Sequence, residues 1–168
     1  LRQYYALILE EGVLEEGLRA ARWPGRLELV REEPRILLDG AHNPEGMAAL
    51  AAALKESFRW RRLHLMIGAL ANKNHIDMLR HILPIADSLI VTEPDFKKKL
   101  DAGELARIAA GIPGCPADAA AEPDWRRALD MLIGRTGPED LAVVSGSLYL
   151  IADVRSSLLH DRDIEKGW

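Results

Sequence analysis

The stretch from Asp39 to Pro44, with the sequence Asp-Gly-Ala-His-Asn-Pro, holds the highest density of residues suited to binding a nucleotide or a carboxylate. Asp39 can accept hydrogen bonds from ribose hydroxyls, and His42 can donate to a phosphate oxygen or a carboxylate. Gly40 and Ala41 have small side chains that let a ligand approach the backbone. A structural interpretation is also open, in which Asp39 caps a turn and His42 is a solvated loop residue.

Two further stretches have the same character. Arg26 follows a Trp-Pro-Gly turn at 23–25, from which a guanidinium could make a bidentate contact to a phosphate. An ordinary surface arginine at the start of a strand would give the same sequence pattern. Ser147 ends a Ser-Gly-Ser stretch that follows the apolar run 141–144. Its hydroxyl suits a carboxylate or phosphate at a helix N-terminus, or it simply caps that helix.

The chain contains no residue set that would catalyse a reaction on its own. No Gly-x-x-x-x-Gly-Lys-Ser/Thr phosphate loop occurs, and the histidines have no metal-ligand spacing. The single cysteine, Cys115, excludes an intrachain disulfide and a cysteine metal cluster. We therefore assign no metal-binding residue in this chain. Lys73, between Asn72 and Asn74, could meet a phosphate, while Asn74 could cap a helix.

The candidate residues fall where strands give way to helices, and the apolar patterns define both. Strands are expected over 26–30, 35–38, 63–67, 88–92, 115–119 and 141–145. Helices are expected over 44–57, with Asn43 as N-cap, and over 74–83, 102–110, 125–134 and 148–159. The short Glu33-Pro34 turn requires residues 27–31 to pair antiparallel with 35–38, whereas the later strands, separated by helices, form a parallel sheet. The prediction is an α/β fold with a mostly parallel six-stranded sheet, one antiparallel edge strand and helices on both faces.

Composition sets broad limits on function. The formal net charge of −4 argues against general affinity for nucleic acid or membrane surfaces, and the apolar runs are too short or too interrupted by charge to span a bilayer. Few cysteines and no signal peptide favour a cytoplasmic location. We expect a helical exit segment from a missing N-terminal ATPase domain over residues 1–22, broken near Gly12, one domain over 23–159 and a mobile tail over 160–168.

Three motifs together resemble the folylpolyglutamate and dihydrofolate synthases of the Mur ligase superfamily. They are Trp-Pro-Gly-Arg ending at Arg26, Asp-Gly-Ala-His-Asn-Pro from Asp39, and Ser-Gly-Ser-Leu-Tyr from Ser145. The resemblance covers roughly residues 20–158. It implies a Rossmann-like C-terminal domain that closes over ATP and L-glutamate, in a ligase whose own N-terminal domain carries the P-loop and the Mg²⁺ ligands. It also implies that dihydropteroate or tetrahydrofolate is the partner substrate and that this chain alone is inactive.

The resemblance also implies residue roles. Arg26 would reach the ATP phosphates, and Asp39 would contact the nucleoside, with Gly40 and Asn43 lining the nucleotide site. His42 would lie near the transferring phosphate and the incoming glutamate, and Ser147 would face glutamate. In such ligases a folate carboxylate is phosphorylated and the glutamate amine attacks the acyl phosphate.

Two departures from the family pattern accompany these matches. The family commonly has Asp-Lys-Asp where this chain has Asn72, Lys73 and Asn74, and it tends to place an arginine where Lys98 lies. Lysine keeps the charge but loses the planar fork of arginine. These changes leave two alternatives open: another Mur-type amide ligase with a different acceptor, or a non-catalytic nucleotide- or anion-binding module.

Overall fold

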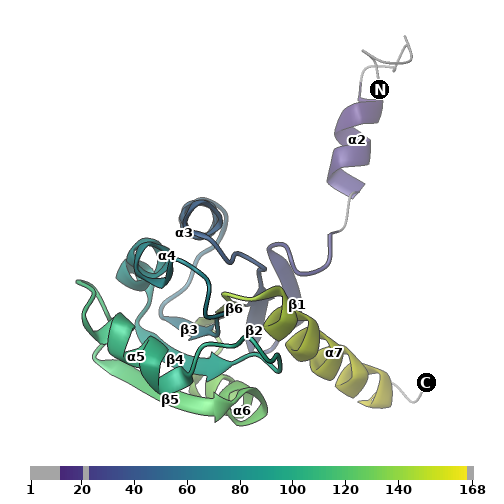
Figure 1. The fold of residues 1–168 in the computed structure, drawn as a ribbon. Coiled ribbons are helices and arrows are strands. Elements are labelled where there is room, and N and C mark those ends of the chain that lie inside the picture. The colour runs from purple at the N-terminus through teal and green to yellow at the C-terminus, as the bar shows by residue number, and fades with distance from the viewer. Residues whose placement is uncertain (1–11, 21–22, 166–168) are drawn as a thin grey trace.

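The computed structural model describes residues 12–20 and 23–165 of the 168-residue chain. Its centre is a six-stranded sheet with the order β1-β2-β6-β3-β4-β5 (Figure 1). The strands are Glu28–Glu32 (β1), Arg35–Leu38 (β2), Leu63–Ile67 (β3), Ser88–Glu93 (β4), Asp118–Asp124 (β5) and Leu141–Ser145 (β6). Among these strands β1 alone is antiparallel to its neighbour, so the predicted fold class is confirmed.

Helices cover both faces of the sheet (Figure 1). The strand side chains alternate between two apolar cores, one on each face. Leu37, for example, belongs to the core on the face covered by the helices Pro44–Ser57 (α3), His75–Ile82 (α4) and Ala102–Ala110 (α5). Its neighbours Ile36 and Leu38 belong to the core on the other face, which Trp125–Arg135 (α6) and Leu148–Glu165 (α7) cover. A short 3₁₀ helix, Leu83–Ile85 (η1), follows α4, and Val13–Ala20 (α2) precedes the sheet. None of the described helices has the length and hydropathy needed to cross a membrane.

Local sequence sets where these elements begin. Helices α3 to α6 each start at an Asn or Asp whose side chain accepts a backbone N–H of the first turn, namely Asn43, Asn74, Asp101 and Asp124. The β1–β2 hairpin turns at Glu33-Pro34, and its register places Glu28 opposite Leu38 and Glu32 opposite Arg35. Residues 39–43 therefore lead directly from the end of β2 into α3.

Three predicted elements had bounds that were wrong by more than one residue. The edge strand β1 begins at Glu28 rather than at 26, because Leu27 has a left-handed φ of 43° that is incompatible with a strand. The expected strand 115–119 is instead Asp118–Asp124, an exposed edge strand that pairs only with β4 and carries small alanines with a weak apolar signal. Helix α7 continues to Glu165, six residues past its predicted end at 159.

The predicted exit segment and tail are only partly described. Residues 13–20 form the helix α2, and Gly12 has a φ of 98°, which fits a break at that position. Residues 1–11 and 21–22 lie outside the described residues, as do 166–168. That residues 160–168 are mobile stays a prediction.

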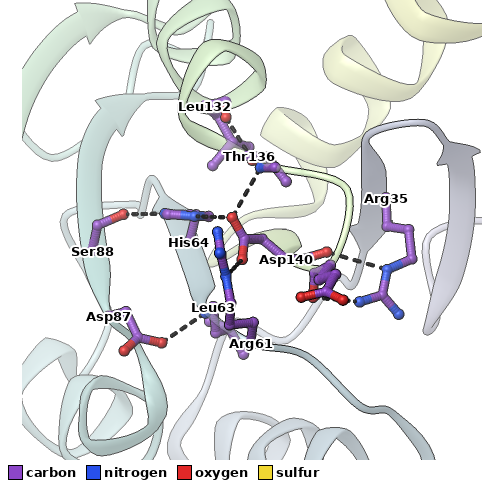
Figure 2. A network of polar contacts seen from close by, with 11 residues as sticks. Arg35, Arg61, Leu63, His64, Asp87, Ser88, Leu132, Thr136 and Asp140 are labelled. Carbon is purple, nitrogen blue, oxygen red and sulfur yellow. Dashed lines mark hydrogen bonds and ion pairs between the residues drawn. The ribbon is translucent and has the colours of Figure 1, made fainter.

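A buried polar network occupies the edge of the sheet at the amino ends of β3, β4 and β6 (Figure 2). Asp140, just before β6, accepts hydrogen bonds from Gly137 N at 2.9 Å, from Arg61 Nε at 3.2 Å and from His64 Nε2 at 3.4 Å. His64 Nδ1 lies 2.7 Å from Ser88 Oγ. Burial alone would raise the pKa of Asp140, but these hydrogen bonds and the Arg61 charge outweigh it and lower the pKa to about 2.

Candidate functional site

The candidate residues meet at the opposite side of the sheet, at the carboxyl ends of β2 and β6. These two strands are parallel neighbours, so the loops that follow them lie side by side. The loops are joined directly: Gly146 N donates to Ala41 O at 2.9 Å, and Ser145 Oγ donates to the same carbonyl at 3.3 Å. Residues 39–42 and 145–147 therefore share this end of the sheet.

Asp39 joins its own loop to the Arg26 turn, because both of its carboxylate oxygens accept backbone hydrogen bonds. Oδ1 accepts from Ala41 N at 2.8 Å within its own loop, and Oδ2 accepts from Leu27 N at 3.0 Å. The second bond fixes Leu27 in its left-handed conformation, which a leucine rarely adopts unaided. The structural interpretation of Asp39 as a turn cap is therefore correct. Each oxygen keeps a further lone pair, so a ribose contact stays possible in chemical terms.

Arg26 lies against the same loop. Gly40 N donates to Gly25 O at 2.8 Å, and a methyl group on Gly40 would collide with the Arg26 guanidinium and with Leu148. Glycine at position 40 is thus what lets the guanidinium approach the backbone. Within the part of the chain that the structure describes, the Arg26 side chain makes no hydrogen bond or ion pair. The cation is therefore available to a ligand.

A cavity of about 480 Å³ opens beside Arg26. It is lined by residues from the Arg26 turn, the Asp39 loop and the start of α3, namely Arg26, Leu27, Asp39, Gly40, Ala41, His42, Asn43, Glu45, Gly46, Ala49 and Leu50. Asn43 caps α3 as predicted, because its Oδ1 accepts from Gly46 N at 2.7 Å. The cavity therefore combines one unpaired cation with a helix N-terminus, two features that favour an anion.

His42 separates this cavity from a second, smaller pocket. The smaller pocket has a volume of about 150 Å³ and is lined by His42, Leu70, Lys73, Gly146, Ser147, Leu148 and Tyr149. His42 is half-buried, and its Nδ1 lies 2.8 Å from Gly40 O. Because a carbonyl can only accept, Nδ1 carries a proton in this geometry. Nε2 is then an acceptor in the neutral imidazole and a donor only in the imidazolium.

Ser147 lines the smaller pocket while also capping α7. Its Oγ accepts from Tyr149 N at 3.2 Å, and the residue is 2% exposed. The predicted capping role is therefore present. The hydroxyl still has a proton to donate towards the pocket.

The family follows from a comparison with known proteins. Residues 25–148 match the family model described as "Mur ligase, glutamate ligase domain". The chain belongs to the Mur ligase family. That match includes the three motifs of the candidate site except Trp23 and Pro24 at one end and Tyr149 at the other.

Relatives of named activity agree with this assignment. The chain is 34% identical over 149 residues to a probable bifunctional folylpolyglutamate synthase/dihydropteroate synthase of Haloferax volcanii, covering 89% of this chain and 17% of the relative. It is 32% identical over 154 residues to the dihydrofolate synthase/folylpolyglutamate synthase of Bacillus subtilis, covering 89% and 34%. The chain thus spans between about a sixth and a third of the length of these curated relatives.

A solved structure resembles the whole Mur ligase domain. Mycobacterium tuberculosis folylpolyglutamate synthase, complexed with ADP, superposes with a TM-score of 0.84 at 27% identity, covering 94% of this chain and 37% of that one. The predicted resemblance to folylpolyglutamate synthases is therefore confirmed. The shared fold places the motif loops of this domain at the sheet edge described above.

The two departures from the family pattern have different surroundings in this Mur ligase domain. Asn74 caps α4, accepting from Asp77 N at 3.3 Å and donating to Asp77 Oδ2 at 2.7 Å. Lys73 lines the small pocket with His42 and Ser147, which places one cation close to those two residues. Asn72 and Lys98 are exposed, and the Lys98 carbonyl accepts from Ala71 N at 2.9 Å.

Two features of the site were missed by sequence reasoning. Phe96 stacks on Tyr149, with ring centroids 4.0 Å apart and an interplanar angle of 13°, beside the small pocket. Glu28 pairs with Arg155 beneath the Arg26 turn, at 2.9 Å. Both pairs join residues more than 50 positions apart, so neither leaves a local pattern in the sequence.

No set of three or more His, Cys, Asp or Glu side chains in the described residues is arranged to hold a metal ion. The Arg26 cavity, by contrast, fits part of a nucleotide, since it offers a cation and a backbone surface that only glycine leaves open.

Proposed function

We propose that this chain is the C-terminal domain of an ATP-dependent ligase that joins L-glutamate to a folate, either dihydropteroate or tetrahydrofolate, in the cytoplasm. The observation that carries the proposal is the single sheet edge that unites Arg26, Asp39, His42 and Ser147 around two adjoining cavities. The ADP complex of the similar tuberculosis enzyme and the glutamate ligase name of the family model support it.

The larger cavity suits the nucleotide. Arg26 would bind the phosphates through charge-assisted hydrogen bonds, since its guanidinium is otherwise unpaired. Asp39 would use its remaining lone pairs for the ribose while keeping the Arg26 turn in place. Gly40 and Asn43 would line the site through backbone and helix start. Mg²⁺, held by the N-terminal domain, would neutralise phosphate charge when bound.

The smaller pocket suits glutamate. A dicarboxylate fits a pocket that contains Lys73 and the Ser147 hydroxyl. The folate carboxylate would be activated as an acyl phosphate, and the glutamate amine would attack its carbonyl carbon, releasing phosphate. His42 lines both cavities, so it lies where that attack would occur.

The hydrogen bond from His42 Nδ1 to Gly40 O limits what His42 can do. The neutral imidazole offers Nε2 as an acceptor, which suits the proton of the glutamate amine. The imidazolium offers Nε2–H as a donor to the phosphate oxygens. Both actions stabilise charge that develops during the reaction, so His42 would act on kcat more than on ATP affinity.

The test uses the full-length protein with ATP, Mg²⁺, L-glutamate and either dihydropteroate or tetrahydrofolate. ADP release that depends on both glutamate and a folate, together with a product one glutamate heavier by mass spectrometry, is the expected result. Turnover with a different acceptor in place of folate would instead assign another Mur-type ligase. No turnover with any acceptor would favour a non-catalytic binding module.

The isolated 168-residue chain should be inactive and should bind ATP weakly, because it contains no P-loop. Calorimetric titration of this chain with ATP checks that expectation. Tight, micromolar binding would contradict the assignment of half of the nucleotide site to another domain.

A further inference from the structure

One stripe of α7 supports the turn that carries Arg26. Leu148, Ile151 and Arg155 are three and four residues apart, so they share a face of the helix. Leu148 lies beside Gly40, where the Arg26 guanidinium packs, and a methyl group on Gly25 would come within 2.9 Å of Ile151 Cγ2. The turn is therefore packed closely onto this face of α7.

Arg155 reaches that turn through Glu28. Its Nε lies 2.9 Å from Glu28 Oε2, and its Nη2 lies 3.0 Å from Oε1, so the pair is bidentate. Glu28 Oε2 also accepts from Gly25 N at 2.7 Å. The pair is partly buried, with the side chains of Arg155 and Glu28 33% and 24% exposed, so solvent screens it less than a surface ion pair. The Arg155 hydrogen bonds lower the pKa of Glu28 and keep it ionised.

The Gly25 residue is consequently held at both ends. Glu28 binds its N–H, and Gly40 N donates to its carbonyl at 2.8 Å. Its φ of 70° lies in the left-handed region, which glycine adopts without strain. Arg26 N closes the turn onto Trp23 O at 3.1 Å. The backbone of Arg26 is fixed, although its guanidinium has no partner among the described residues.

The geometry points to Arg155 as a positioning residue for ATP. Through Glu28 and Gly25 it sets where the Arg26 guanidinium stands, without touching the nucleotide itself. This inference rests on the proposed function, in which Arg26 binds the ATP phosphates. Because Ser147 caps the start of α7, the same helix also connects the nucleotide cavity to the smaller pocket.

Three variants of the full-length enzyme test this. Arg155→Met keeps the length and the apolar stem but removes the bidentate pair, so KM for ATP should rise about tenfold while KM for glutamate changes little. Arg155→Lys keeps the charge but loses the fork, and its effect on KM for ATP should be intermediate. Arg127→Met, on the exposed surface of α6, is the matched control and should leave the kinetics unchanged.

A double-mutant cycle separates positioning from a general loss of stability. In an Arg26→Ala background, Arg155→Met should raise KM for ATP no further, because the residue it positions is gone. If Arg155→Met leaves KM for ATP unchanged while Arg26→Ala raises it, the inference is overturned and the proposed function stands. An equal rise in KM for ATP on Arg155→Met in the wild-type and Arg26→Ala backgrounds would also overturn the inference. Absence of any ligase activity in the wild-type enzyme would instead overturn the proposed function.

Discussion

Replacing Asp140 with asparagine would measure how much one buried carboxylate stabilises this fold. Asp140 is 2% exposed and belongs to the polar network of Figure 2. It directly precedes β6, whereas the candidate site lies after the carboxyl end of that strand. Three donors converge on it, from Gly137, Arg61 and His64. An asparagine keeps one accepting oxygen but turns an NH₂ group towards at least one of these donors, leaving a buried hydrogen bond unmade.

The size of the effect follows from the pKa of Asp140. A pKa that falls from its usual 3.8 to about 2 on folding corresponds to roughly 2.5 kcal/mol of stability at neutral pH. The Arg61 side chain is 63% exposed, so solvent weakens its share of the interaction. We therefore expect Asp140→Asn to lower the free energy of unfolding by about 2 kcal/mol near pH 7.

The pH dependence gives a sharper test than the magnitude. Since the folded-state pKa of Asp140 is lowered, its contribution is fully present above about pH 4 and is lost as the pH falls towards about 2. Urea unfolding of the wild-type chain and of Asp140→Asn, compared from about pH 7 to about pH 2.5, should show a difference that shrinks below about pH 4. Asp130→Asn, at an exposed position on α6, is the control. A wild-type-to-variant difference that stays constant over this whole range would refute the reasoning.

Four further predictions concern the full-length enzyme and are checked by steady-state kinetics and thermal unfolding. Arg26→Ala removes a phosphate contact of about 1.5–3 kcal/mol, so KM for ATP should rise by roughly one to two orders of magnitude with little change in stability. His42→Ala should mainly lower kcat, with a modest change in KM for ATP. Ser147→Ala should raise KM for glutamate and also cost about 1 kcal/mol of stability, because the α7 cap is lost. Gly40→Ala should displace the Arg26 guanidinium and raise KM for ATP. Wild-type kcat and KM in all four variants would show that these residues have structural roles only.

The parallel part of the fold was predictable because each strand is a continuous apolar run buried on both faces. Strands β3, β4 and β6 have this pattern. The alternation of strands and helices along the chain then requires the strands to pair in parallel. The common edge for Asp39 and Ser147 follows from the same rule, since both residues follow parallel strands. Strand β5 was predicted with the wrong bounds because its pairing with β4, and not its own hydrophobicity, makes it a strand.

Contacts between distant segments could not be predicted from one sequence. Glu28 and Arg155 are 127 positions apart, and nothing local to either residue favours that pair over any other exposed charges. The left-handed Leu27 was equally hidden, because leucine avoids that conformation unless another group, here Asp39, stabilises it. The structural and functional hypotheses for Asp39 also could not be separated without coordinates.

In the structure, those hypotheses are compatible with each other. Each carboxylate oxygen of Asp39 uses one lone pair to accept a backbone hydrogen bond and retains another. The Ser147 hydroxyl accepts a hydrogen bond as the cap of α7 and retains a proton to donate. A site built this way is preorganised, since the groups that would meet the ligand are already fixed by the loops they hold together. It follows that substitutions at Asp39 or Ser147 combine kinetic and stability effects. Arg26, whose side chain is unpaired among the described residues, is the position where a change in KM for ATP reports binding alone.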